Sequence, residues 1–181
     1  MVGMERASLR STDTGQVVEG PGWFILNVGE ASWQRMPDLG AWCGFEAADA
    51  PFERFGISVN VLVPGQAAGL YHAEDAQEGF LVLAGECLAV VEGAEHRMRQ
   101  WDYLHCPPGT LHITIGAGDA PCALLMIGAP RSSSLDEIHY PADPVAVRHG
   151  VAATSTTRSS KEAYAGRDRT VTRERAPWPP V

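Results

Sequence analysis

Short runs in which apolar and polar residues alternate fill the chain between residues 22 and 130, and this period-2 pattern predicts β-strands. The clearest run is 56–65, which ends at a Pro-Gly pair. Its apolar residues are expected on one face of a half-buried strand: Ile57, Val59, Val61 and Val63. No segment between residues 22 and 130 has the 3.6-residue periodicity of an amphipathic helix.

The pattern predicts about eight or more short strands in this region. The predicted strands lie at 22–28, 41–47, 56–63, 80–83, 87–91, 95–99, 103–106, 112–116 and 122–130. The runs 80–83 and 87–91, joined by Ala84-Gly85-Glu86, have the signature of a hairpin. Many short strands with Gly/Pro turns and no intervening helices favour an all-β sandwich or barrel.

Both ends of the chain lack this pattern. We therefore expect an N-terminal arm over 1–21, a β-barrel over 22–130 and a C-terminal extension over 131–181. Within the extension, 160–166 predicts one or two helical turns. The rest is either a disordered tail or an arm packed against the barrel or a partner subunit, and Trp178 favours the packed arm.

Composition narrows the classes of function. The net charge of −8 disfavours nucleic-acid binding, because an acidic surface repels phosphate backbones. No apolar run approaches the roughly 18 residues of a membrane span, and the polar N-terminus has no signal-peptide pattern, so we expect a cytoplasmic protein. The four cysteines form no CxxC pair and are expected to be free, buried thiols: Cys43, Cys87, Cys106 and Cys122.

Candidate metal ligands occur in two places. His72 and Glu74 are two residues apart, so in a strand their side chains share a face, and a turn at 75–76 can bring Glu78 beside them. His112 begins another predicted strand after the turn Pro107-Pro108-Gly109. Carboxylates at the edge of an apolar core need a compensating charge, which a divalent cation supplies. Imidazole and carboxylate ligands suit borderline transition metals.

These two segments resemble the two motifs of the cupin superfamily. The first motif, G-x5-H-x-H-x3,4-E-x6-G, is matched in spacing by His72, Glu74, Glu78 and Gly85, with Glu74 where a second histidine is expected. The second motif, G-x5-P-x-G-x2-H-x3-N, is matched from Pro107 to His112. Trp101 and Gly116 stand at the positions of its first glycine and its asparagine, respectively.

The resemblance implies a jelly-roll (cupin) β-barrel with irregular terminal arms, and one divalent metal ion (Zn, Fe, Mn or Ni) held by His72, Glu74, Glu78 and His112. Glu74 is either a ligand or a catalytic base. Of His105 and Cys106, one must face inward, where it would line the cavity.

For the function, we expect a metal-dependent small-molecule enzyme, such as a dioxygenase or isomerase, with its ligand inside the barrel. The alternatives are a non-catalytic cupin that binds or senses a small molecule, and a barrel that has lost its metal. The resemblance also implies a homodimer.

Overall fold

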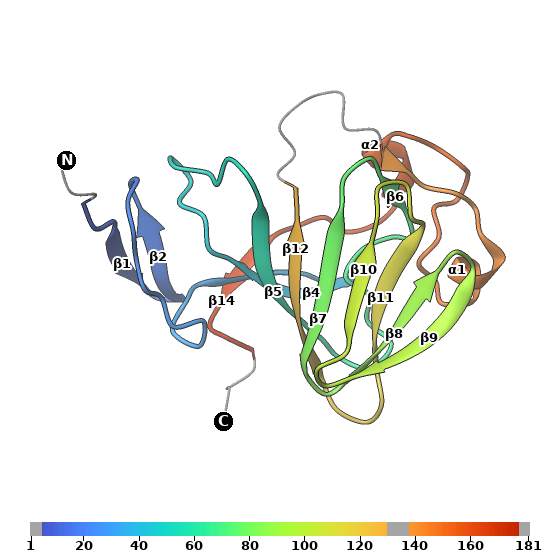
Figure 1. Ribbon diagram of the computed structural model, residues 1–181, viewed down its shortest axis with the longest axis horizontal. Helices are drawn as coiled ribbons and strands as arrows, with labels where there is room; N and C mark the ends of the chain where they lie inside the picture. The colour runs from blue at the N-terminus through green and yellow to red at the C-terminus, as the bar shows by residue number, and fades with distance from the viewer. Residues whose placement is uncertain (1–4, 130–137, 178–181) are drawn as a thin grey trace.

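The computed structural model describes residues 5–129 and 138–177, and in these ranges the chain is mostly antiparallel β-structure (Figure 1). The strands are β1 (Ser8–Thr12), β2 (Gly15–Glu19), β3 (Trp33–Met36), β4 (Leu39–Gly44), β5 (Gly56–Leu62), β6 (Ala73–Glu74), β7 (Glu78–Ala84), β8 (Glu86–Val91), β9 (Ala94–Arg99), β10 (Tyr103–Cys106), β11 (His112–Ala117), β12 (Cys122–Gly128), β13 (Ile138–His139) and β14 (Thr172–Glu174). Two short helices follow the main strands: α1 (Pro144–Arg148) and α2 (Ser160–Ala163).

Two facing sheets build the jelly roll. The larger sheet has the order β10-β7-β12-β5-β4-β3-β14, and the smaller has the order β11-β8-β9. Apolar side chains from both sheets fill the space between them: Leu62, Val82, Cys87, Ala89, Met98, Cys122 and Leu124. The predicted all-β jelly roll is therefore confirmed.

The predicted hairpin of 80–83 and 87–91 is wrong. Strand β7 pairs with β10 and β12, whereas β8 pairs with β9 and β11, so the chain passes from one sheet to the other at Gly85. Gly85 has a φ of +71°, and a Cβ there would lie 2.7 Å from the carbonyl oxygen of Pro121. Glycine thus permits a tight corner between sheets, which resembles a hairpin turn in sequence.

The predicted strand at 22–28 is also wrong. The segment forms no ladder beyond a single bridge between Arg6 and Trp23, and Trp23 and Ile25 are exposed. Leu26 and Val28 nevertheless pack against the outer core of the large sheet. The strand in this region is instead β3, which pairs with β4 and β14 and has only two apolar residues.

The terminal arms are more ordered than the sequence indicates. Residues 8–19 form the β1–β2 hairpin, which lies at the side of the molecule away from β8 and β9 (Figure 1). The C-terminal arm, residues 138–177, packs on the jelly roll: β13 pairs with β6, β14 pairs with β3, and Ala163 of α2 is buried. Helix α2 confirms the helical turn predicted at 160–166, whereas Trp178 lies outside the described residues.

All four cysteines are free and buried, as expected. No helix within the described ranges is long and apolar enough to cross a membrane.

Candidate metal centre

The backbone brings the two predicted motifs together at the mouth of the jelly roll. His72 and His112 form an antiparallel bridge, in which the His72 N–H donates to the His112 carbonyl (3.2 Å) and the His112 N–H donates to the His72 carbonyl (2.8 Å). Glu78 begins β7 in the opposite sheet. The turn at Gly109 is fixed by its N–H, which donates to the carbonyl of Glu74 (2.6 Å).

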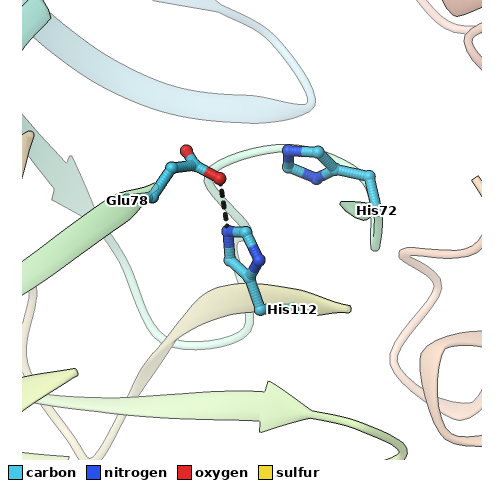
Figure 2. Close-up of side chains that lie close together, drawn as sticks. All are labelled: His72, Glu78 and His112. Atoms are coloured by element: carbon cyan, nitrogen blue, oxygen red, sulfur yellow. Dashed lines mark ion pairs between the residues drawn. The ribbon is translucent and has the colours of Figure 1, made fainter. Parts of the chain in front are cut away.

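Three of the four predicted ligands converge. One ligand atom each from His72, Glu78 and His112 lies within 4.8 Å of the other two, and Figure 2 shows their side chains around a common space. Ligands about 2.1 Å from a shared ion lie at most about 4.2 Å apart, so these side chains need to move by only a fraction of an ångström to share one. The cluster could therefore hold a metal ion.

Both imidazole rings are oriented by backbone carbonyls. The Nδ1–H of His72 donates to the Leu70 carbonyl (2.7 Å), and the Nδ1–H of His112 donates to the Thr110 carbonyl (2.9 Å). Because a carbonyl can only accept, the proton of each neutral ring is on Nδ1 and the lone pair is on Nε2. This second-sphere arrangement is the one that metal-binding histidines commonly have.

The Nε2 atom of His112 makes no hydrogen bond within the described residues, although the side chain is only 2% exposed. Glu78 Oε2 lies 3.2 Å from it, but a lone pair facing a carboxylate forms no bond without a cation between them (Figure 2). Burial lowers the pKa of His112. Contacts with the Cys106 thiol, the Glu78 carboxylate and the Thr110 carbonyl raise it, however, and the net pKa is about 10. The position therefore favours a cation, which can be a proton or a metal ion.

Glu74 lies beside this cluster and outside it. Its Oε1 atom is 3.4 Å from Nε2 of His72, but Glu74 does not belong to the group whose ligand atoms all lie within 4.8 Å of one another. Its side chain is 12% exposed. Glu74 is therefore next to His72 without joining the cluster, and it is not among the residues that line the adjoining cavity.

A cavity of about 220 Å³ adjoins the three residues. Its other walls include Phe80 and Met126 of the large sheet, Thr114 of β11, and Tyr140 and Tyr164 of the C-terminal arm. The Tyr140 ring stacks on the His72 ring, with centroids 5.7 Å apart, and the Tyr164 hydroxyl accepts from the Leu70 N–H (3.2 Å).

Sequence reasoning missed the two tyrosines, because the arm has no periodicity that would place them. The sequence could have indicated Thr114, because it lies two residues after His112 on a predicted strand and therefore on the same face. The open choice between His105 and Cys106 is decided: Cys106 is buried beside His112, and His105 is exposed.

Comparisons with known proteins agree with this architecture. Residues 59–128 match the family model for the cupin domain, and no protein with a curated description matches the chain. A predicted oxalate decarboxylase from Thermotoga maritima is similar in structure, with a TM-score of 0.54 and 17% identity over 59% of this chain and 98% of that one. The polyketide cyclase RemF from Streptomyces resistomycificus has a TM-score of 0.52 and 13% identity, over 59% and 79% of the two chains.

A sugar phosphate isomerase of the cupin superfamily from Silicibacter pomeroyi has 25% identity and a TM-score of 0.49. The match covers 56% of this chain and 66% of that one, so this chain spans slightly less than two thirds of the isomerase's length. At this level of similarity the structural matches show the fold alone.

Proposed function

Because this chain carries a cupin domain, we propose that it is a metal-dependent enzyme acting on a small molecule held inside the jelly roll. The observation that supports this most strongly is the convergence of two Nε2 lone pairs and one carboxylate, from His72, His112 and Glu78, on one point. Three ligands leave coordination positions for a substrate, as in catalytic rather than structural metal sites.

The donor set fits a divalent transition metal. Two neutral imidazoles and a carboxylate suit Zn, Fe, Mn or Ni, and the buried Nε2 of His112 lacks any other partner among the described residues. When bound, the metal would supply Lewis acidity toward a substrate oxygen. The protein's part is to hold the imidazoles in one tautomer through Leu70 and Thr110 and to exclude water.

For Glu74 we propose the role of proton acceptor rather than ligand. It is partly buried, lies 3.4 Å from His72, and stands outside the converging group. A carboxylate that is held next to a polarised substrate is placed to take a proton from a carbon or a hydroxyl group. A proton acceptor at this position supports isomerase-like chemistry.

The cavity indicates what kind of molecule fits. Phe80, Met126 and the two tyrosines provide apolar and aromatic surface around the polar cluster. Pockets of this kind bind small organic molecules that have one polar end. The net charge of −8 supports a small ligand rather than nucleic acid as the partner.

Metal content tests the first part of the proposal. We expect protein purified without chelators to contain about one equivalent of a transition metal, and the His112→Gln variant to contain far less. A trace of metal far below one equivalent in the wild-type protein would refute the proposal.

Turnover tests the second part. A panel of keto acids and diketones in D2O, followed by NMR, should show deuterium exchange at an enolisable carbon that is lost in Glu74→Gln. Oxygen uptake by the iron-loaded protein with phenols would indicate an oxygenase instead. Full metal occupancy without either reaction would favour the non-catalytic alternative, a metal-binding cupin that binds or senses a small molecule.

A further inference from the structure

A buried threonine hydroxyl in the cavity has no protein partner. Thr114 is 1% exposed, and its Oγ1 atom makes no hydrogen bond with any part of the chain that the structure describes. Thr114 lies two residues after His112 on β11, so both side chains point into the cavity. Their neighbours Ile113 and Ile115 belong to the apolar cluster that also contains Ala146 of α1, and Ile113 lines the cavity as well.

Packing alone does not explain a threonine here. Valine has nearly the same shape and would fill the same space, whereas a buried hydroxyl without a partner destabilises the fold. The hydroxyl is therefore expected to bond something that occupies the cavity. A molecule bound to this hydroxyl would lie close to the metal cluster, because His72, Glu78 and His112 line the same cavity.

The cavity is larger than a single water molecule would need. Its volume of about 220 Å³ compares with roughly 30 Å³ per water molecule. The walls beyond the polar cluster are apolar, with Phe80 and Met126 on the large sheet. An organic molecule with a few heavy atoms fits this space, with its polar end toward His112 and Thr114.

The charge around the cavity points to an acid. A second cavity of about 250 Å³ shares Ala68, Tyr140 and Tyr164 with the first. Among the described residues that line it, Arg169 is the only charged one, and its guanidinium lies 5.3 Å from the centroid of the Tyr164 ring. Arg169 has no carboxylate within ion-pairing distance in the described ranges. The positive charge of Arg169 beside the cavity, in a protein whose net charge is −8, favours the entry of an anionic ligand.

We infer that Thr114 is a substrate-positioning residue, whose hydroxyl donates a hydrogen bond to the carboxylate of a small organic acid bound at the His72–Glu78–His112 cluster. This inference rests on the proposed metal site and names the class of its ligand. The carboxylate would offer one oxygen to the cluster and the other to Thr114, which fixes the orientation of the acid.

The test compares Thr114→Val, which keeps the shape, with Thr114→Ser, which keeps the hydroxyl. Pyruvate and the uncharged 2,3-butanedione, which is similar in size, are titrated into the metal-loaded full-length proteins by calorimetry. We expect the wild-type protein to bind pyruvate at least about tenfold more tightly than butanedione. Thr114→Val should weaken pyruvate binding about tenfold or more, because a hydrogen bond to a charged acceptor is lost. Thr114→Ser should stay within a few-fold of wild type.

Two further measurements separate this inference from the metal site. Metal affinity, from competition with a chelator, should be unchanged in Thr114→Val. Without metal or ligand, Thr114→Val should melt at or above the wild-type temperature, because it removes an unpaired buried hydroxyl.

Unchanged pyruvate affinity in Thr114→Val would overturn the inference and leave the metal site standing, as would a wild-type protein that binds metal but no pyruvate. A Thr114→Val protein that melts several degrees lower without metal or ligand would show that the hydroxyl has a structural partner. It would also overturn the inference. Failure of the wild-type protein to bind metal would refute the proposed function itself.

Discussion

Glu74 and Glu78 are four residues apart, but they contact different groups. Glu78 Oε2 faces Nε2 of His112 at 3.2 Å inside the cluster, whereas Glu74 lies outside the cluster with its Oε1 atom 3.4 Å from Nε2 of His72. We therefore predict that Glu78→Gln weakens metal binding by about a hundredfold or more, because it removes a charged ligand. Glu74→Gln should keep metal affinity within a few-fold and lose activity. Chelator competition and turnover assays on the two matched variants would measure this.

Equal losses of metal affinity in the two variants would contradict this prediction. They would show that Glu74 is a fourth ligand, as the cupin resemblance also allows.

The raised pKa of His112 predicts that metal binding depends on pH. Its pKa of about 10 exceeds the ordinary 6.5, so without metal the folded protein holds a proton that the unfolded chain loses. That proton stabilises the metal-free fold below pH 6.5, and this stabilisation is lost as pH rises toward 10. Since a metal must displace the same proton, its affinity should rise with pH, by up to about tenfold per unit between pH 7 and 9.

Chelator competition and thermal melting across this range would check both trends. Cys106→Ala removes one of the contacts that raise the pKa of His112, so its metal affinity should depend less steeply on pH. A wild-type affinity that is independent of pH would contradict the prediction.

Motif spacing predicted three residues of the cluster, since His72, Glu78 and His112 occupy positions that a jelly roll brings together. It could not assign Glu74, because the side chain's distance from the cluster depends on the turn at 75–76 and on packing around β6. Thr114 was within reach of strand alternation, but its unpaired hydroxyl becomes visible only when burial is known. Tyr140 and Tyr164 come from a segment without periodicity, and their place depends on tertiary contacts.

Gly116 on β11 shows how close packing against a neighbouring strand can leave no room for the side chain that a motif expects. It stands where the second cupin motif has asparagine, and a Cβ there would lie 2.2 Å from the Val63 carbonyl oxygen. Its N–H donates to the Gln66 carbonyl and its own carbonyl accepts from Gly65, both at 2.8 Å, so the backbones are fixed. We predict that Gly116→Ala lowers the free energy of unfolding by about 2–3 kcal/mol.

Gly44→Ala is the matched control, because a Cβ at the end of β4 meets nothing within 4 Å. It should change stability by less than about 0.5 kcal/mol in the same denaturant titration. Equal stability of the Gly116→Ala and wild-type proteins would show that β11 moves away from Val63 easily.

At the level of elements, the runs of apolar residues at 41–47, 56–63, 112–116 and 122–130 predicted strands that overlap β4, β5, β11 and β12. The pairing of the strands could not be predicted from the same pattern. The runs on either side of Gly85 look like a hairpin, since local sequence does not distinguish a turn within a sheet from a corner between sheets. Strand β3 was missed because it has only two apolar residues, and one of its two partners, β14, lies about 140 residues later in the chain.

At the scale of the whole molecule, the two edges of the large sheet differ. Within the described residues, the three-residue strand β14 forms one edge, and β10 forms the opposite edge, where Trp101 and Tyr103 are exposed. Open edges are common places for pairing between chains. We predict a homodimer, which light scattering would show as a mass of about twice 19.4 kDa. Tyr103→Lys at this edge should shift the protein toward the monomer. A wild-type mass of one chain at micromolar concentration would contradict the prediction.

The C-terminal arm both stabilises the fold and forms part of the cavity wall. Its strand β14 pairs with β3 and forms the Arg35–Glu174 ion pair (2.8 Å), Ala163 is buried beside Leu70, and Tyr164 lines the cavity. Deleting residues 159–181 removes all of these contacts. We predict a loss of about 2 kcal/mol or more, which lowers the melting temperature by about 4–8 °C, from the apolar area and ladder lost.

The same deletion should speed the extraction of metal by a chelator, because one wall of the cavity is gone. Tyr164→Phe is the control for this effect: it loses only the hydroxyl that accepts from Leu70 and keeps the aromatic wall. We expect this variant to melt slightly below the wild type and to release metal at nearly the wild-type rate. If the truncated protein released metal as slowly as the full chain, the arm would serve stability alone. Access to the cluster would then be controlled from the strand side of the cavity, where Phe80 and Met126 lie.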